Sequence, residues 1–457
     1  MVYIVYLPRC ILYRGLFVCY NYGMSERIER INKKNKKRKQ NKVNGRFYGR
    51  LLIICAEIFV LIVIVGVSLL LFTTAEKEKE QKEVIEAKSA AELFISADIP
   101  DKISENIDTT EADDSRYGKE LADADYCLEK RIYSKETASD EEVVLAFAGD
   151  VSFAEGYANM GALSKRGNDI TECFDEFILK EMRDADIFMI NNEFTYTNRG
   201  TPTSGKTYTF RTDPENVKLL HDMGVDIVSI ANNHTYDYGE ISLLDTLTTL
   251  EGAAMPYVGA GKNKAEAIKP VYFVANDIKI AYISATQIEQ GDNPDTVGAG
   301  ENTAGVFRCW NDDTIYDVIR EAKKQSDFVL VYVHWGQEMQ ETLHWAQPDQ
   351  AKKMAEAGAD LIVGDHPHCL QEIAYIDRVP VVYSMGNFWF NSKTQDTGIL
   401  KVTLNQTGLK NLQFIPARQE NCYTRLLSGN EAQEVFSYIN SLSQNAMLDE
   451  RGYIQKR

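Results

Sequence analysis

The chain has 457 residues, 44% of them hydrophobic, which is enough for a sizeable buried core beside terminal segments. Its net charge of −17 is unevenly spread: residues 1–73 carry 13 Lys/Arg and 3 Asp/Glu, and residues 74–457 carry 37 and 64. A basic head and an acidic body predict different surroundings, and eight cysteines without paired spacing exclude a disulfide framework or zinc ribbon as the organising feature.

The N-terminal part predicts a membrane anchor. Residues 1–50 form a basic tail, and residues 51–73 are the expected transmembrane helix. Within them Leu51–Phe72 is an apolar run of 22 residues with one charge, Glu57. At about 1.5 Å per residue this run spans a hydrocarbon core of roughly 30 Å. Because Lys/Arg clusters stay inside, we expect a cytoplasmic N-terminus, a single pass and an extracellular main domain.

Alternatives remain for this part of the chain. The apolar run could be a buried core helix or a cleaved signal peptide, although it is longer than either usually is. The basic stretch 27–50 could be a nucleic-acid patch. Next to an anchor, attraction to anionic lipid is the favoured interpretation, and no nucleic-acid partner is predicted. Translation starts at Met1 or at Met24.

Beyond the anchor, composition predicts three further segments. Residues 74–140 are mostly acidic and poor in aromatics, which indicates a stalk or linker. The main domain is expected over residues 141–430, followed by a C-terminal helix and tail over 431–457. In the main domain, short apolar runs alternate with amphipathic stretches, which predicts an α/β layer sandwich with a largely parallel core. The expected strands are 143–150, 185–193, 225–234, 278–286, 327–336, 359–368 and 379–387, and the expected helices are 213–224, 241–252, 312–325 and 347–358.

Polar clusters follow most of these apolar runs. Since ligands gather at the carboxyl ends of parallel strands, we expect the clusters to form one site. The candidate residues are Asp150, Glu193, Asn233, His234, Asp237, His334, His366 and His368. Carboxylate, imidazole and amide oxygen suit one or two Mn, Fe or Zn ions. His221 and His344 are assigned to structure or solvent.

Single residues of the set allow simpler interpretations. Asp150 could cap a helix, and His334 could be a packed core histidine. In an extended H-x-H segment the two rings would point to opposite faces, so both reach a metal only if the chain bends at Pro367. Arg211 and Lys206 could meet an anionic substrate or be solvated loop charges. Asn387 follows the last strand and is expected at the pocket rim.

The order GD, NNE, ANNHTYDYG, GAG, HWGQE, GDHPH and YSMGNFWF resembles the CapA-type capsule synthesis proteins, which are linked to poly-γ-glutamate capsules in Gram-positive bacteria. The resemblance covers roughly residues 143–391. That family is similar in turn to the calcineurin-like metallophosphoesterases, in which strand-end motifs build a two-metal site within a four-layer α/β sandwich. The resemblance therefore implies that fold, here preceded by one transmembrane helix, and a metal-dependent hydrolase or its descendant.

The resemblance also implies roles for single residues. Asp150 would ligate one metal, Glu193 would bridge two, and Asn233 would contribute an amide oxygen. His234 would stabilise or protonate the leaving group, with Asp237 beside it. The remaining ligands would be His334, His366 and His368, and two metals would clamp the charge of the transition state.

Three positions depart from the patterns of these families. Ser152 stands where a phosphoesterase usually has histidine, Glu193 sits in N-x-E, and Asp365 follows Gly364 where a capsule protein more often has histidine. Fewer strong ligands would mean one metal, weaker affinity, or a site that binds without turnover.

Three functions from different classes are therefore predicted. The first is a cell-surface capsule protein acting in synthesis, export or attachment of poly-γ-glutamate or a related anionic polymer. The second is an envelope phosphoesterase acting on phosphate esters. The third is a non-catalytic scaffold that docks a membrane synthase. An acidic domain repels a polyanion in bulk, so contact with the polymer must be local, through metal or a few cations.

Overall fold

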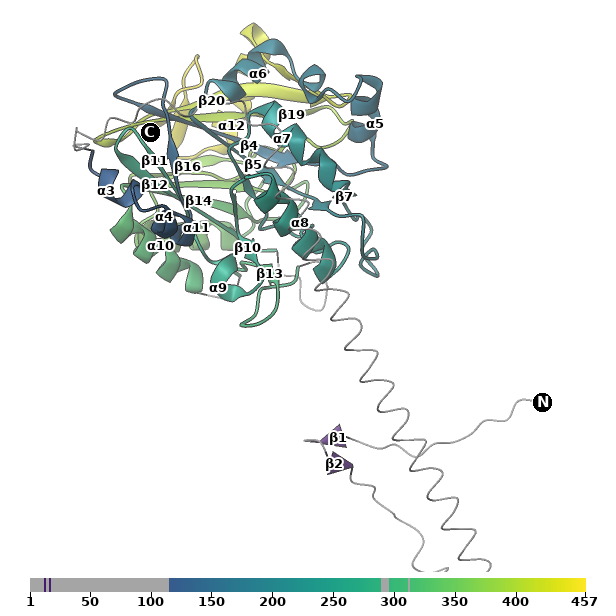
Figure 1. Cartoon of the computed structure of the whole chain (residues 1–457). Helices are drawn as coiled ribbons and strands as arrows, with labels where there is room; N and C mark the ends of the chain where they lie inside the picture. The colour runs from purple at the N-terminus through teal and green to yellow at the C-terminus, as the bar shows by residue number, and fades with distance from the viewer. Residues whose placement is uncertain (1–11, 14–15, 18–114, 289–295, 311–312) are drawn as a thin grey trace, which may run out of the picture. The chain divides into compact units, whose positions relative to one another are not determined.

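The computed structural model describes residues 12–13, 16–17, 115–288, 296–310 and 313–457. The chain divides into two units, Met1–Glu105 and Asn106–Arg457. In the first unit, strands β1 (Leu12–Tyr13) and β2 (Leu16–Phe17) pair antiparallel. The elements that carry the site belong to the second unit (Figure 1).

An eight-stranded sheet forms one half of the second unit. Its order is β21-β20-β19-β4-β5-β8-β9, with β18 paired to β4 beside this path. β4, β5, β8 and β9 run parallel, and β19 to β21 continue the sheet antiparallel. The bounds are β4 Val143–Val151, β5 Ile187–Asn192, β8 Ile227–Ser229, β9 Tyr257–Val258, β18 Asn387–Trp389, β19 Gln395–Asn405, β20 Gly408–Glu420 and β21 Tyr423–Leu426.

A seven-stranded sheet forms the other half. Its order is β16-β17-β15-β14-β12-β11-β3. The central strands β12, β14, β15 and β17 run parallel, as the sequence predicts. The bounds are β3 Ile132–Lys135, β11 Val271–Ala275, β12 Ile278–Thr286, β14 Phe328–His334, β15 Leu361–Asp365, β16 Ile373–Ile376 and β17 Val379–Val382.

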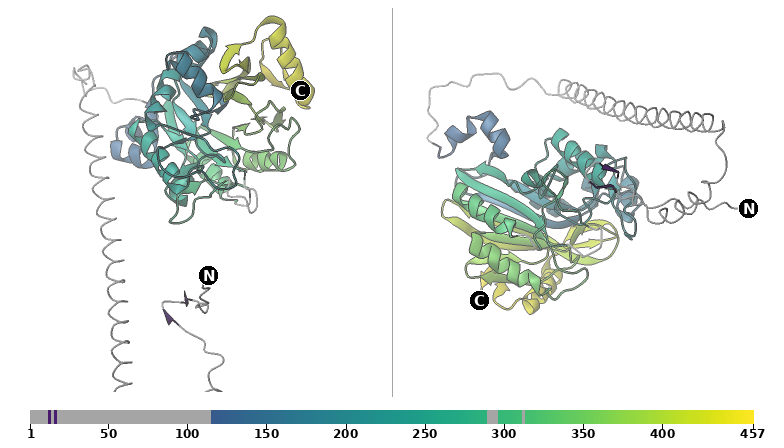
Figure 2. Two further views of the ribbon diagram at one scale, coloured as in Figure 1. Left: turned by 90° about the vertical axis from the view of Figure 1, so that its right-hand side faces the viewer. Right: turned by 90° about the horizontal axis from the view of Figure 1, so that it is seen from below.

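Helices cover the outer faces of both sheets, which gives four layers (Figures 1 and 2). Residues of α5 to α8 pack on the eight-stranded sheet, and residues of α10 and α11 on the seven-stranded sheet. The bounds are α5 Ala158–Lys165, α6 Glu176–Arg183, α7 Lys218–Met223, α8 Glu240–Gly252, α9 Lys264–Ala267, α10 Thr314–Gln325 and α11 Ala346–Ala357, with 3-10 turns at Ile170–Cys173 and Pro214–Val217. The predicted α/β layer sandwich is confirmed.

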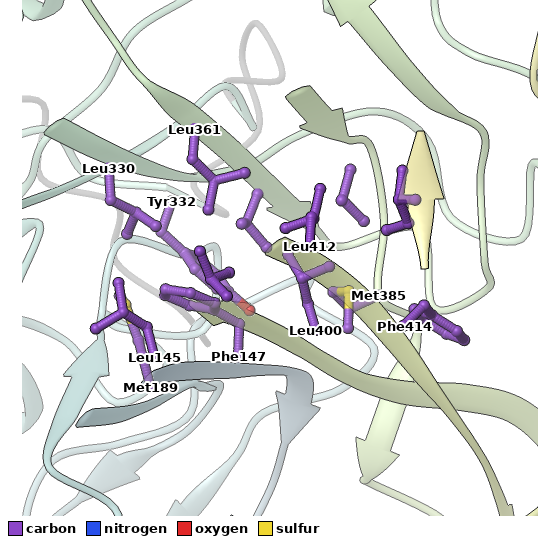
Figure 3. Close-up of a cluster of buried hydrophobic side chains, with 14 of the residues drawn as sticks. Leu145, Phe147, Met189, Leu330, Tyr332, Leu361, Met385, Leu400, Leu412 and Phe414 are labelled. Carbon is purple, nitrogen blue, oxygen red and sulfur yellow. The ribbon is translucent and has the colours of Figure 1, made fainter. Parts of the chain in front are cut away.

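The period of each element explains these layers. In β4, Leu145 and Phe147 face the core between the sheets, whereas Ala146 and Ala148 face the helices. Figure 3 shows Leu145, Phe147 and Met189 of one sheet pointing toward Leu330, Tyr332 and Leu361 of the other. In α10 the buried side chains recur at helical spacing, so one stripe of this helix faces the sheet.

Two segments expected outside the main domain belong to its fold. Residues 118–135, predicted as stalk, form α3 (Gly118–Leu121), α4 (Ala124–Lys130) and β3, and β3 pairs with β11 at a sheet edge. The polar composition of this segment reflects an edge position. The predicted C-terminal tail forms β22 (Ala446–Leu448) and β23 (Ile454–Lys456) after α12 (Gly429–Leu442), and all three join the core between the sheets. Short pairs β6–β7 (Thr195–Tyr196, Arg211–Thr212) and β10–β13 (Ala260–Gly261, Gly305–Val306) complete the described strands.

Helix α3, the first helix among the described residues, is fastened at the amino end of the seven-stranded sheet, and this contact is called the α3 clamp. Tyr117 Oη donates to Asp327 Oδ2 at 2.8 Å, and Arg116 pairs with Asp327 Oδ1 at 2.6 Å. Lys279, whose side chain is buried, pairs with Glu120 of α3 and lies over the Tyr117 ring at 5.6 Å. The chain therefore enters the sheet beside the first residues of β12 and β14.

Four parallel strand pairs begin with the same device. An aspartate precedes the second strand of each pair, and its carboxylate accepts the N–H of a residue in the neighbouring strand. We call them the amino-end aspartates. The distances from the backbone nitrogen to the carboxylate oxygen are 2.7 Å for Val144 and Asp186, 2.9 Å for Phe188 and Asp226, 2.8 Å for Lys279 and Asp327, and 2.8 Å for Val329 and Asp360. The carboxylates thus extend the hydrogen-bond ladders and fix the strand register.

In the described part of the chain, no helix combines the length and hydropathy that a membrane span requires. The predicted anchor, residues 51–73, lies outside the described residues.

Candidate metal centre and its cleft

Two rows of polar side chains, one from each sheet, meet at the carboxyl ends of the strands. In the eight-stranded sheet Asp150 lies in register with Asn387 of β18 on one side and Asn191 of β5 on the other. In the seven-stranded sheet His334 of β14 lies in register with Asp365 of β15. Asp150, Asn191, His334 and Asp365 lie at or next to the carboxyl ends of their strands, and Asn387 begins β18 beside Asp150, so the topology places them together.

Loops that follow the strands supply the other candidates. Glu193 comes directly after β5, and Asn233 and His234 come after β8. His366 (φ 93°) and His368 (φ 57°) both adopt left-handed backbone, which non-glycine residues rarely do. The chain therefore bends around Pro367, as predicted, and both rings turn inward, with centroids 5.9 Å apart.

Glu193 lies at the middle of the imidazoles. Its side chain is fully buried, and Oε1 has no hydrogen-bond partner. The Nε2 atoms of His234, His334 and His368 lie 3.7, 3.9 and 4.0 Å from this oxygen. An anionic oxygen held in this way has lost water without gaining a donor, a costly arrangement that a cation would relieve.

A second group of donor atoms gathers around His334. Its Nε2 lies 2.8 Å from Asn233 Oδ1 and 3.0 Å from His366 Nδ1. Two ligands on one metal with bonds of about 2.0–2.1 Å are about 3.3 Å apart in tetrahedral geometry. Three overlapping trios have one donor atom each within 4.8 Å of the others: Glu193–His334–His366, Asp150–His334–Asp365 and Asp150–Glu193–His368.

The electrostatics of the site also fit a cation. Burial, together with the charges of Asp150 and Asp365, raises the pKa of Glu193 well above its usual value. Burial opposes ionisation of Asp150 too, but the hydrogen bond and charge of His368 outweigh it and lower the Asp150 pKa. Burial, aided by the charge of His368, lowers the pKa of His366 to about 3. His366 is therefore neutral at pH 7, the form that binds metal.

These residues fit a divalent metal on two counts. Buried carboxylate oxygens of Glu193 (Oε1) and Asp365 (Oδ2) have no hydrogen-bond partner. The donor set of imidazole, carboxylate and amide oxygen is the set that Zn, Mn and Fe accept.

His234 is held by contacts on the side of its ring that faces away from Glu193. Its Nδ1 donates to Asp237 Oδ2 at 2.7 Å, so its Nε2 faces the centre. Asp237 also accepts the Phe210 N–H at 2.6 Å and pairs with Lys206 at 2.6 Å. The Phe210 ring stacks on His234 with centroids 4.2 Å apart. The imidazole is thus fixed in direction and shielded on one face.

A cleft with a volume of about 470 Å³ opens above this centre. Its lining includes His234, His368, Asn233, Asn387 and Ser152. Its sides combine aromatic rings with charged and amide groups, contributed by Tyr157, Tyr208, Phe210, Phe390, Lys206, Lys393, Glu338, Asn391 and Gln395. The cleft thus offers amide, charged and aromatic groups to a ligand, with Lys206 already paired to Asp237.

The predicted site residues fall into two groups. The structure brings together Asp150, Glu193, Asn233, His234, Asp237, His334, His366, His368 and Asn387. Arg211 instead lies over the Tyr238 ring at 4.5 Å, whereas Lys206, the other cation considered from the sequence, lines the cleft. The role of Arg211 in substrate binding stays a prediction.

Sequence reasoning missed two asparagines that hold the carboxylates. Asn191 donates to Asp150 Oδ1 at 2.9 Å and to Glu193 Oε2 at 3.2 Å. Asn232 in turn donates to Asn191 Oδ1 at 2.9 Å. The repeated Asn-Asn in INNE and ANNH was the available signal, because the first asparagine of each pair belongs to this supporting chain of hydrogen bonds.

Comparison with known proteins decides the family. Residues 144–392 match the model of the family described as bacterial capsule synthesis protein PGA_cap. The chain belongs to this family. The PGA_cap match spans all the strand-end residues described above, so the site is part of the family domain.

Similar relatives carry related descriptions. The chain is 31% identical over 286 residues to the PGA biosynthesis protein CapA of Bacillus subtilis (strain 168), covering 61% of this chain and 72% of that one. It is 32% identical over 209 residues to the capsule biosynthesis protein CapA of Bacillus anthracis, covering 44% and 50%. A probable polyglutamine synthesis accessory protein of Mycobacterium tuberculosis is 26% identical over 210 residues, covering 44% and 55%. The chain thus spans about half the length of the latter two relatives.

Solved structures give more distant matches. A 5′-nucleotidase from Candida albicans SC5314 is 10% identical, with coverage of 62% of this chain and 53% of that one and a TM-score of 0.33. The protein TT1561 of Thermus thermophilus is 12% identical, with coverage of 57% and 98% and a TM-score of 0.32. At such scores the likeness assigns nothing to this chain.

Proposed function

We propose that this PGA_cap protein is a membrane-anchored, extracellular capsule biosynthesis protein with a metal-dependent, hydrolase-like site. Its substrate is poly-γ-glutamate or a related anionic polymer, handled in synthesis, export or surface attachment. The family match and the descriptions of the Bacillus relatives support the capsule assignment. Lys393, an exposed cation that lines the cleft, supports an anionic ligand, whereas Lys206 is already paired with Asp237.

The observation that carries the metal-dependent site is the Glu193 carboxylate. It is buried without a donor at Oε1 and has three imidazole nitrogens within 4.0 Å. Carboxylates of this kind persist where they bind a cation, because an unpaired buried charge is otherwise costly. A four-layer α/β sandwich with the site at its strand ends also suits a metallophosphoesterase-like enzyme.

A divalent metal bound there supplies Lewis-acid activation and stabilises negative charge in the transition state. Asp150, Glu193, Asn233, His334, His366 and His368 would hold one or two such ions, of Mn, Fe or Zn. His234, whose Nδ1 is held by Asp237, presents Nε2 toward the cleft; as an imidazolium it would stabilise or protonate a leaving group there. Phe210 and Phe390 keep water from the two histidines that they contact.

A non-catalytic scaffold is the second candidate, favoured by Ser152. This serine lines the cleft at the position where a catalytic phosphoesterase usually has histidine, and its Oγ is engaged by the Ala154 N–H. A scaffold would dock membrane synthase subunits and would not need turnover. An envelope phosphoesterase, acting on phosphate esters, remains the alternative if catalysis is found.

Metal content of the full chain tests the proposal. We expect at least one equivalent of Mn, Fe or Zn by elemental mass spectrometry, with a large loss in Asp150→Ala and His366→Ala. His221→Ala is the matched control, because this exposed histidine lies on α7 and contacts the Ala253 carbonyl. A parent chain that stays empty after reconstitution with each metal sinks the hydrolase proposal and leaves the scaffold.

Turnover is tested separately, on a metal-loaded chain. We expect cleavage or transfer of γ-glutamyl polymer to be lost in His234→Ala with metal content unchanged. Activity only on phosphodiesters would favour the phosphoesterase. Loss of capsule on deletion of residues 51–73 alone, with His234→Ala harmless, would favour the scaffold. Fractionation with and without residues 51–73 tests the proposed anchor.

A further inference from the structure

Asp365 is a buried carboxylate whose position in the strand register points it at one ring nitrogen of His334. The two residues are the last paired residues of β14 and β15, and the Trp335 N–H donates to the Asp365 carbonyl at 3.1 Å. Neighbouring residues in a parallel ladder present their side chains on the same face. As a result Asp365 Oδ1 lies 2.9 Å from His334 Nδ1.

The other ring nitrogen of His334 faces the opposite way, into the candidate metal centre. His334 Nε2 has Asn233 Oδ1 at 2.8 Å, His366 Nδ1 at 3.0 Å and Glu193 Oε1 at 3.9 Å. The imidazole therefore has a carboxylate at one nitrogen and a group of metal-binding donors at the other. This is how a metal-binding histidine is held by a hydrogen-bonding carboxylate behind it.

We propose that Asp365 is a positioning residue of this chain: it accepts the Nδ1–H of His334 and so leaves Nε2 free to bind a metal. The proposal rests on the proposed metal site and adds to it a role that none of the predicted ligands has. Asp365 acts through His334, since its bonded oxygen is already committed to the imidazole on the side away from Asn233 and His366.

A rival role for Asp365 is direct coordination. Asp365 Oδ2 has no hydrogen-bond partner, and Asp150, His334 and Asp365 form one of the three clusters that could hold an ion. On the side of Asp365, however, the facing atom of His334 is Nδ1, 2.9 Å from Asp365 Oδ1, so an ion that both residues bound there would be bound through Nδ1. A neutral imidazole that binds an ion through Nδ1 carries its proton on Nε2. Nε2 could then not bind a metal among the larger set of donors around Glu193. The geometry favours the positioning role.

The surroundings hold Asp365 in this direction. Gly364 precedes it, and a Cβ at Gly364 would lie 2.2 Å from Trp335 Nε1 and 2.3 Å from the Tyr383 carbonyl, which are themselves hydrogen-bonded at 2.8 Å. The Asp365 main chain is thus locked between β14 and the strand-end loop. Because its main chain is fixed, the short Asp365 side chain can hold the His334 imidazole in one orientation.

Two substitutions separate the roles in the full chain. Asp365→Asn keeps an acceptor oxygen for the His334 Nδ1–H, whereas Asp365→Ala removes it. Affinity for Zn²⁺ is measured by competition with a chromogenic chelator, and the ligand shell is followed by the visible spectrum of the Co²⁺-loaded chain. We expect Asp365→Ala to weaken Zn²⁺ binding about tenfold to a hundredfold and Asp365→Asn to recover most of it. The Co²⁺ bands of both variants should keep the parent positions and intensities, because the atoms bound to the ion do not change.

The outcomes are distinguishable from failure of the proposed function. A parent chain that takes up neither Zn²⁺ nor Co²⁺ overturns the metal site and this role with it. A parent chain that loads, with both variants equal to it in affinity, overturns only the role of Asp365. If the Co²⁺ bands changed, and if Asp365→Asn lost as much Zn²⁺ affinity as Asp365→Ala, Asp365 would be a direct ligand instead. Thermal unfolding of the metal-free variants at or above the parent temperature excludes a general folding defect.

Discussion

Carboxylate side chains have opposite surroundings at the two ends of the parallel strands. At the amino ends, Asp186, Asp226, Asp327 and Asp360 each accept a backbone N–H from the neighbouring strand. Three of them also pair with a Lys or Arg side chain. At the carboxyl ends, Glu193 and Asp365 each keep a buried oxygen without a partner.

This difference separates stability from function within one fold. A carboxylate that accepts a strand N–H stabilises the register, and hydrogen bonds to charged groups contribute about 1.5–3 kcal/mol. A buried carboxylate left without a donor is destabilising until a cation arrives. The carboxylates at the amino ends therefore stabilise the sheets, and those at the carboxyl ends destabilise the metal-free fold, which is the cost expected of the proposed metal site.

The largest expected effect comes from Gly149, just before Asp150. A Cβ at this position would lie 1.9 Å from the Gly386 carbonyl oxygen, so Gly149→Ala should lower the free energy of unfolding by about 3 kcal/mol. It should also displace Asp150 and reduce metal content. Gly161→Ala is the control: no atom lies within 4 Å, and this position inside α5 should gain about 0.5–1 kcal/mol. Equal unfolding temperatures of the two variants would contradict the close contact.

Metal should stabilise the carboxyl ends selectively. At free metal 100 times the Kd, the free energy of unfolding should rise by about 2.7 kcal/mol. Calorimetry with and without Zn²⁺ should show this gain in the parent chain and in Asp186→Ala, and should show none in Asp150→Ala. A gain that survives in Asp150→Ala would mean that the metal binds elsewhere.

The amino ends should respond in the opposite manner. Asp186→Ala leaves the N–H groups of Ala138 and Val144 without their carboxylate acceptor, so we expect a loss of about 2 kcal/mol. Metal content should stay unchanged. Asp184→Ala, two residues earlier and with a 54% exposed side chain, should change stability by no more than about 0.5 kcal/mol in denaturant titration. If Asp186→Ala lost metal while still fully folded, the proposed separation between stabilising amino ends and a metal-binding carboxyl end would be contradicted.

The smallest effect is a gain in stability, and its size depends on pH. Burial and the charge of Asp150 raise the pKa of Asp365 well above its usual value, so folding favours the protonated form. The metal-free fold then loses stability as pH rises from the unfolded pKa, about 3.9, through the folded one. Asp365→Asn removes this loss, so without metal it should gain about 1 kcal/mol at pH 7 and nothing below about pH 4. A gain of equal size at both pH values would assign it to packing instead.

Sequence reasoning reached the layers and most of the site because both follow from local patterns. Apolar runs such as 278–286 match β12 residue for residue, and the polar clusters after them converge because parallel strands share one direction. The supporting residues Asn191 and Asp365 could not be predicted from local patterns, because they act on residues of the neighbouring strand. Their partners, Asp150 and His334, are fixed by register, which no local pattern contains.

Other differences have similarly non-local causes. Residues 118–135 are polar enough to suggest a linker, and only the pairing of β3 with the edge of β11 gives them a place in the fold. The recurring Asp before strands, in ADIF, VDIV, SDFV and ADLI, is visible in the sequence, but its meaning depends on which strand lies alongside. Arg211 is a candidate by its charge alone, and its contact with Tyr238 depends on the loop after β8.

The α3 clamp has a mechanical consequence. A pull transmitted through the chain ahead of Ser115 would load the contacts of Arg116 and Tyr117 with Asp327 and of Glu120 with Lys279 before it reached β3. These contacts lie at the amino ends of β12 and β14, the length of a strand away from His334. Tension would therefore be taken up at the amino ends of these strands before it reached the loops of the proposed metal site at their carboxyl ends.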